Sequence, residues 1–173
     1  MAKNYTMNTG IVAVLLALTI LFPFNGSAQS RNAIIGTWKL ISATDTTDKG
    51  QVIKNAYGLN PTGFLTYTAE GRMMALITNG GRKPLSVNDW VAAPASERAE
   101  AFATMIAYAG RYTLSGDKVI HHLEVASLQN VVGADLVRTI VKFEGNRVTL
   151  RTSPLLKGGL QIASQELVWE RMN

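Results

Sequence analysis

The chain contains no cysteine and only two histidines among its 173 residues. Without cysteine it has no disulfide, no thiolate nucleophile and no lipid carried by an N-terminal cysteine. A structural zinc site normally takes three or four ligands, mostly from cysteine and histidine. The composition therefore excludes disulfide scaffolds and thiol enzymes. We expect neither a metal site nor a cofactor.

Long hydrophobic runs are also scarce, because the chain has a single one, IVAVLLALTILFPF at 11–24. This run is shorter than the roughly 20 residues that a helix needs to cross a bilayer. Lys3 precedes it and the small-residue stretch NGSA follows it, which is the pattern of a secretory signal peptide cleaved after Ala28. A retained membrane anchor is the competing interpretation. We expect residues 1–28 to be a signal peptide and residues 29–173 to form one exported domain, periplasmic or secreted, with no membrane span.

The charge does not point to a nucleic-acid partner. The chain has 17 basic and 12 acidic residues, and removal of Lys3 with the leader leaves 16 against 12, a net charge of +4. The basic residues are scattered, and only Arg82 and Lys83 are adjacent. A nucleic-acid surface would need them gathered in a patch or stripe.

Short runs rich in β-branched and aromatic residues alternate with turn signals such as AEG, SGD and EGN. This alternation is typical of antiparallel strands joined by hairpins. The expected strands are 37–44, 51–57, 63–68, 72–78, 111–115, 118–127, 135–143, 147–152 and 162–172. A sandwich and a barrel are both compatible with this pattern. We favour an all-β, antiparallel up-and-down barrel of about 8–10 strands, because closure removes the exposed sheet edges.

One segment, 93–110, departs from the strand pattern. Pro94 or Ser96 is placed to begin a helix and Gly110 to end it. Four apolar residues would then share one helical face, namely Phe102, Met105, Ile106 and Ala109. We expect this to be the one substantial helix, between the fourth and fifth strands.

Several blocks of the chain resemble, in order, those of the bacterial lipocalin-like domain family. The first strand opens with a G-x-W motif, Gly36-Thr37-Trp38, and the last strand contains LVWER at 167–171. The intervening blocks are NPTGFLTYTAEGRMMALI, AYAGRYTLSGDKVIHHLEV and GADLVRTIVKFEGNRVTL. The likeness covers nearly all of residues 34–172. It implies a small calycin-type β-barrel with a cavity for an apolar or amphipathic molecule, but neither a particular ligand nor a reaction.

The resemblance also implies a structural pair at the barrel floor. Trp38 matches the family's tryptophan, and Arg171 is the candidate for the arginine that lies across it. A guanidinium stacked on an indole keeps its donors free for backbone carbonyls. We expect this pair to support the fold and not to bind a ligand.

The two histidines stand side by side in IHHLEV, 120–125. Neighbouring side chains of a strand point to opposite faces, so His121 and His122 cannot both reach one metal ion. His122 shares a face with Glu124, but two ligands do not complete a site. His121 lies in the more apolar phase, with Val119, Leu123 and Val125, and is expected to point inward.

The next strand does not reveal its inner face, because Arg138 shares a phase with Leu136, Ile140 and Lys142. The resemblance at LVRT places Arg138 inside. With a tyrosine, these residues would form a small-molecule site in an apolar pocket, where the arginine selects a carboxylate, phosphate or enolate-like oxygen. The candidate ligand-binding residues are His121, Arg138, Tyr67, Tyr108 and Tyr112. The alternative is that His121 is hydrogen-bonded within a filled core.

The leading hypothesis is a non-catalytic protein that binds or carries a small hydrophobic or amphipathic molecule in its cavity. The alternative is a barrel enzyme of the isomerase, cyclase or hydratase type, with His121 as acid or base and Arg138 stabilising negative charge. A third possibility is a filled barrel that acts through its outer surface. The sequence contains no nucleophile elbow and no cofactor fingerprint, so no catalytic residue is assigned.

Overall fold

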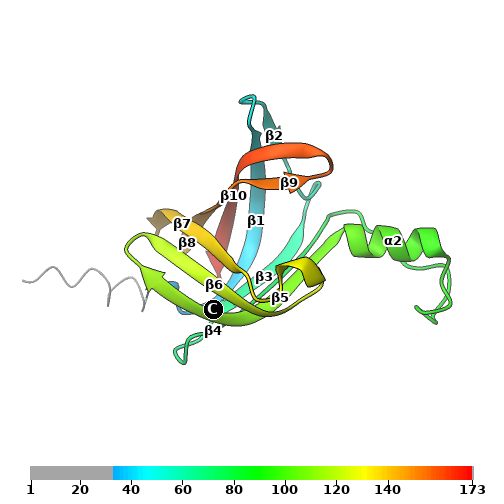
Figure 1. Ribbon diagram of the computed structural model, residues 1–173, viewed down its shortest axis with the longest axis horizontal. Coiled ribbons are helices and arrows are strands. Elements are labelled where there is room, and N and C mark those ends of the chain that lie inside the picture. Colours follow the sequence, from blue (N-terminus) through cyan, green and yellow to red (C-terminus); the bar gives the residue numbers. More distant parts are fainter. Residues whose placement is uncertain (1–32, 173) are drawn as a thin grey trace, which may run out of the picture.

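The computed structural model describes residues 33–172 and shows an all-β barrel (Figure 1). Eight antiparallel strands form the wall: β1 (Gly36–Thr47), β3 (Thr62–Tyr67), β4 (Arg72–Thr78), β5 (Met105–Ser115), β6 (Lys118–Ala126), β7 (Asp135–Glu144), β8 (Arg147–Thr152) and β10 (Leu160–Arg171). The predicted fold class is confirmed. The predicted signal peptide, residues 1–28, lies outside the described residues.

Four further elements lie outside this wall. They are the strands β2 (Val52–Lys54) and β9 (Leu155–Lys157), the helix α2 (Ala95–Ala103) and the 3-10 turn η1 (Gln129–Val131). Helix α2 lies between β4 and β5, as predicted, and projects away from the strands (Figure 1). Within residues 33–172, no helix combines the length and the apolarity that a bilayer crossing requires.

The barrel closes because β1 pairs with β10. Their register runs from Trp38 opposite Arg171 to Thr47 opposite Ile162. The other edge of β1 is shared, since its first half pairs with β3 and its second half with β2. Both edges of β1 are therefore hydrogen-bonded, which removes the open edge that an unclosed sheet would present.

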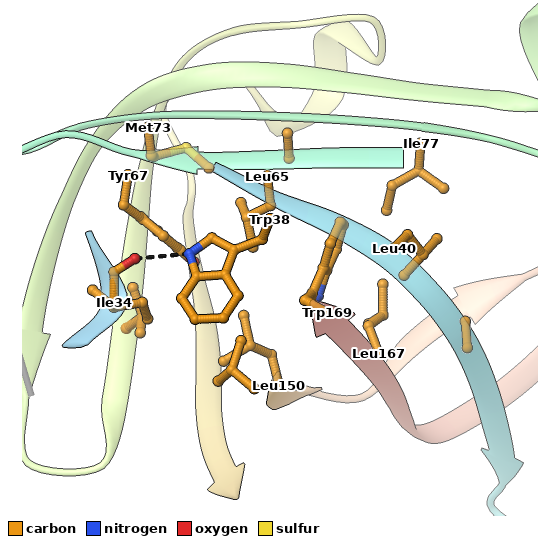
Figure 2. Close-up of a cluster of buried hydrophobic side chains, with 14 of the residues drawn as sticks. Ile34, Trp38, Leu40, Leu65, Tyr67, Met73, Ile77, Leu150, Leu167 and Trp169 are labelled. Atoms are coloured by element: carbon orange, nitrogen blue, oxygen red, sulfur yellow. Dashed lines mark hydrogen bonds between the residues drawn. The ribbon is translucent and has the colours of Figure 1, made fainter. Parts of the chain in front are cut away.

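The strand ends at Trp38 and Arg171 are packed solid and form the floor of the barrel. Figure 2 shows Trp38 among apolar side chains, with its indole nitrogen donating to the carbonyl of Ile34 at 2.8 Å. The Arg171 guanidinium lies 4.2 Å from the centre of the Trp38 ring and donates to the carbonyls of Ala33 and Ile35. This arrangement couples the last strand to the start of the first.

The helix is shorter than the sequence pattern predicts. It ends at Ala103, and β5 begins at Met105, so the expected helical face through Met105, Ile106 and Ala109 is wrong. The reason is sheet pairing: every residue of β4 has a partner in the first part of β5. The hydrogen bonds that this segment forms with β4 outweigh its weak intrinsic preference for a helix.

Gly110 does not end the helix; it lies within β5. A Cβ atom added there would come within 2.0 Å of the carbonyl oxygen of His122, on the neighbouring strand. The pairing of β5 with β6 is irregular at this point, between Ala109 and Gly110. Glycine therefore permits a close approach of two backbones.

Candidate ligand-binding cavity

A cavity of about 420 Å³ opens at the end of the barrel opposite the packed floor. At this end β4 finishes and β5 begins, and exposed apolar side chains of Phe102, Leu128 and Leu156 stand at its rim. Most of the deeper wall is apolar and includes Leu65, Ile77, Ile106, Leu136, Leu150, Leu167 and Trp169. Trp169, Leu150 and Leu167 belong to the same buried cluster as Trp38 (Figure 2), so the cavity borders the packed core.

His121 lies in the cavity wall and is almost completely buried, with 1% of its surface exposed. Its Nε2 atom is 2.7 Å from the hydroxyl of Tyr67, and its Nδ1 atom is 3.5 Å from the hydroxyl of Tyr108. Burial, with the nearby charge of Arg138 and the neighbouring His122, lowers the pKa of His121 well below 6.5. Burial raises the pKa of Tyr67 well above 10.0. Both side chains are therefore neutral at physiological pH.

Arg138 also lines the cavity, in the same phase of β7 as Leu136. The sequence pattern is ambiguous there because β7 contains a bulge: Ile140 pairs with Leu150, but Lys142 pairs with Thr149. The extra residue reverses the inward–outward alternation after Ile140. Lys142 is therefore exposed, although it shares a sequence phase with Arg138. Arg138 thus shares the inner face with apolar residues.

The Arg138 guanidinium has few partners. Nη2 donates to the Tyr108 hydroxyl at 3.4 Å, and Nη1 donates to the carbonyl of Val137 at 3.1 Å. No carboxylate among residues 33–172 forms an ion pair with it, whereas Lys157, also at the cavity, is paired with Asp45. Arg138 is therefore the cavity cation whose charge the described part of the protein leaves unbalanced.

The three candidate tyrosines occupy different positions. Tyr108 lines the cavity, and Tyr67 lies beneath it, against His121. Tyr112 packs edge-on against Tyr67, with ring centres 4.8 Å apart, and donates to the carbonyl of Thr68 at 2.9 Å. The structure thus brings His121, Arg138 and Tyr108 together at the cavity and places Tyr67 and Tyr112 behind them. Their role in ligand binding stays a prediction.

The outward residues of the IHHLEV stretch have separate partners. Nδ1 of His122 is 2.6 Å from Asp135, and Glu124 accepts hydrogen bonds from Arg72 at 2.8 Å. Alternation predicts that Val125 points inward, but it is 60% exposed. The irregular pairing at Ala109 reverses the inward–outward alternation of β6 after Leu123. Alternation therefore predicts β6 correctly only up to that shift.

A second polar cluster at the cavity was not identified from the sequence. Tyr57 donates to the side-chain oxygen of Gln165 at 3.0 Å, and the Gln165 amide donates to Asp45 at 2.6 Å. Lys157 donates to the other oxygen of Asp45 at 3.0 Å and to the carbonyl of Ala56 at 2.9 Å. Burial is the main cause that raises the pKa of Tyr57 to about 12. These groups satisfy one another and link β1, β9 and β10.

One sequence signal pointed to this cluster. Gln165 shares a strand phase with Leu167 and Trp169, so alternation alone predicts an inward glutamine. Alternation does not predict that Asp45 points inward, because the β1–β10 pairing is irregular between Leu40 and Ser42. A bulge of this kind reverses the phase of every later residue in the strand.

Comparisons with known proteins agree with this architecture. A family model described as a lipocalin-like domain matches residues 35–172. No curated protein sequence matches the chain.

Two solved structures show a distant likeness. One is a redesigned β-barrel, 10% identical, with a TM-score of 0.39 over 83% of this chain and 95% of the other. The second is an uncharacterized protein from Bacteroides eggerthii, 14% identical, with a TM-score of 0.41 over 80% and 99% of the two chains. The family match covers the whole barrel, and the chain therefore belongs to the lipocalin-like domain family.

Proposed function

We propose that the protein binds a small hydrophobic or amphipathic molecule inside the barrel. The observation that carries this proposal is the cavity of about 420 Å³, which is open at one end, mainly apolar in its wall and sealed by a packed floor. Small-molecule sites are commonly apolar hollows of about 300–1,000 Å³ with a few placed polar groups. Tyr108, His121 and Arg138 supply such groups here.

The size of the cavity limits its occupant. At about 420 Å³ the cavity lies in the lower half of the usual range for small-molecule sites, about 300–1,000 Å³. A guest too long for this space would reach past the exposed rim residues Phe102 and Leu156.

The burial of His121 favours binding over proton transfer by this residue. A general acid or base works best when its pKa is near the operating pH. His121 has a pKa well below 6.5, and the pKa values of Tyr57 and Tyr67 are raised by burial. The enzyme alternative assigns His121 as acid or base, and burial moves the pKa of this residue away from neutrality.

Titration with N-phenylnaphthylamine, a neutral dye that fluoresces in apolar surroundings, tests the proposal. We expect saturable binding of one dye per chain by protein purified without detergent. Native mass spectra of the same preparation should show either a retained small molecule or uptake of one dye. A linear, unsaturable fluorescence response together with mass spectra of the ligand-free chain alone would contradict the binding function.

We also propose that the barrel works outside the cytoplasm, because residues 1–28 have the sequence pattern of a signal peptide. The mass of the protein recovered from cell fractions tests this. A chain beginning at residue 29 in the periplasmic or extracellular fraction would support export, and an intact chain in the cytoplasmic fraction would contradict it.

A further inference from the structure

The charges of the side chains inside the cavity bear on the charge of the ligand. The ionisable side chains that face this space are those of Tyr57, Tyr108, His121, Arg138 and Lys157, and their charges can be summed from the contacts. The charge of Lys157 is balanced by its ion pair with Asp45 at 3.0 Å, and burial keeps Tyr57 and His121 neutral. Tyr108 contributes a hydroxyl group. Arg138 remains, and no carboxylate of the described chain pairs with it. The cavity therefore has one uncompensated positive charge.

An uncompensated guanidinium in a partly enclosed, mainly apolar cavity is unfavourable unless an anion joins it. Arg138 has five N–H donors, of which one meets the Val137 carbonyl and another the Tyr108 hydroxyl. Guanidinium donors match the paired oxygens of a carboxylate or a related oxyanion. The remaining donors can hold such a group at the cavity wall.

Tyr108 lies beside Arg138 and can bind the same acidic group of a ligand. Its oxygen accepts from Nη2 of Arg138 at 3.4 Å and lies 3.5 Å from Nδ1 of His121. When Tyr67 donates its proton to Nε2 of His121, Nδ1 carries the ring proton and is directed to the Tyr108 oxygen. The proton of Tyr108 is then free to bind an oxygen of the ligand, so both donors converge on one acidic group.

We propose that the cavity takes a monoanionic amphiphile, whose acidic group is bound by Arg138 and Tyr108 and whose apolar chain lies against the wall formed by Leu136, Leu150 and Leu167. This inference rests on the proposed binding function and names its ligand class. A single charge is expected because a single cavity cation is unbalanced. The acidic group is a carboxylate or another singly charged oxyanion.

Displacement of the neutral dye by three ligands of equal chain length tests the charge preference. Decanoate is the anion, decanol the neutral compound, and decylamine, protonated at neutral pH, the cation. We expect decanoate to displace the dye from the wild type at concentrations at least about tenfold lower than decanol, because only the anion forms charge-assisted hydrogen bonds with Arg138. Decylamine should be the weakest of the three.

Substitution of Arg138 tests its role directly. Arg138→Gln should remove the advantage of decanoate and leave displacement by decanol within about twofold of wild type. Arg138→Lys keeps the positive charge but loses the paired N–H donors of the guanidinium, so it should retain part of the preference for decanoate. Tyr108→Phe should weaken decanoate alone, by severalfold. The control is Arg151→Gln, which removes an arginine from the outer face of β8, where it is paired with Glu166 at 2.6 Å, and should leave the ranking unchanged.

The two proposals fail in different ways. A dye that binds saturably but is displaced equally by decanoate and decanol, or a preference for decanoate that survives in Arg138→Gln, would overturn the anion proposal and leave the cavity function standing. A dye that does not bind, together with mass spectra of the ligand-free chain alone, would overturn the binding function itself. Decyl phosphate, with up to two charges, completes the series: displacement well ahead of decanoate would contradict the single-charge assignment.

Discussion

The hydroxyl of Tyr67 lies 2.7 Å from Nε2 of His121, and both side chains are buried, His121 in the cavity wall and Tyr67 beneath it. A charge on either buried side chain would be poorly solvated. Burial therefore lowers the pKa of the histidine and raises that of the tyrosine. This neutral, hydrogen-bonded pair supports the polar side of the cavity without adding charge to it.

The depressed pKa of His121 predicts a pH dependence of stability. Below pH 6.5 the unfolded chain takes up a proton at this residue that the folded protein does not, so the free energy of unfolding falls as the pH falls. The slope is at most about 1.4 kcal/mol per pH unit for one group, and the contribution is constant above this window.

Urea unfolding of wild type and His121→Gln at pH 7, 6 and 5 measures this effect, because the difference between the two proteins cancels the other titrating groups. The wild type should lose stability relative to the variant on acidification. His122→Gln, which removes the exposed histidine, should keep the loss that His121 causes. Parallel curves for wild type and His121→Gln would contradict a buried, neutral histidine.

Asp45 is expected to contribute strongly to stability. It is 3% exposed and accepts from both Gln165 and Lys157, so Asp45→Ala removes the acceptor of a buried amide and the counter-charge of a partly buried lysine. We expect the free energy of unfolding to fall by about 2–3 kcal/mol. Asp48→Ala, at an exposed position in the adjoining turn, should change it by less than about 0.5 kcal/mol. Equal effects of the two substitutions would show that the buried network is not stabilising.

Arg171 should stabilise the fold without affecting ligand binding. Arg171→Gln removes the contact with the Trp38 ring and the hydrogen bonds to two carbonyls, and we expect a loss of about 2 kcal/mol. Arg147→Gln breaks an exposed pair with Glu170 and should lower stability by less than about 1 kcal/mol. Thermal unfolding and dye titration of both variants check this, and weakened dye binding in folded Arg171→Gln would contradict a purely structural role.

Filling the cavity should abolish binding. Leu136 lines the cavity from β7, and Leu136→Trp places a large ring in the space that a guest would occupy. Dye affinity should fall at least about tenfold, the equivalent of about 1.4 kcal/mol. Val141→Trp is the matched control, because Val141 belongs to the same strand but is 42% exposed. A dye that binds both variants equally well would lie somewhere other than the cavity.

The sequence pattern predicted much of the barrel because its information is local. Alternation through Val119, His121 and Leu123 identified the inner face of β6, and turn signals separated the strands. The G-x-W resemblance located the floor tryptophan, Trp38, and its candidate partner Arg171. These features depend on residues close together in the chain or on a recognisable motif.

The remaining features depend on pairing between distant segments. The bulges after Leu40 and after Ile140 change the phase of their strands, and alternation cannot foresee them. The contact between Asp45 and Gln165 spans 120 positions and exists only because β1 closes on β10. Likewise, residues 105–110 have a helical pattern but become a strand when β4 pairs with them.

The location of a bound guest tests the central claim most directly, because the outer wall also has a groove, of about 300 Å³, lined in part by Met74 and Val125. Nuclear Overhauser effects between the neutral dye and methyl-labelled protein distinguish the two sites. We predict cross-peaks from the dye to the methyl groups of Leu136, Leu150 and Leu167, which line the cavity. Cross-peaks to Met74 and Val125, with none to the three leucines, would contradict a ligand site inside the barrel.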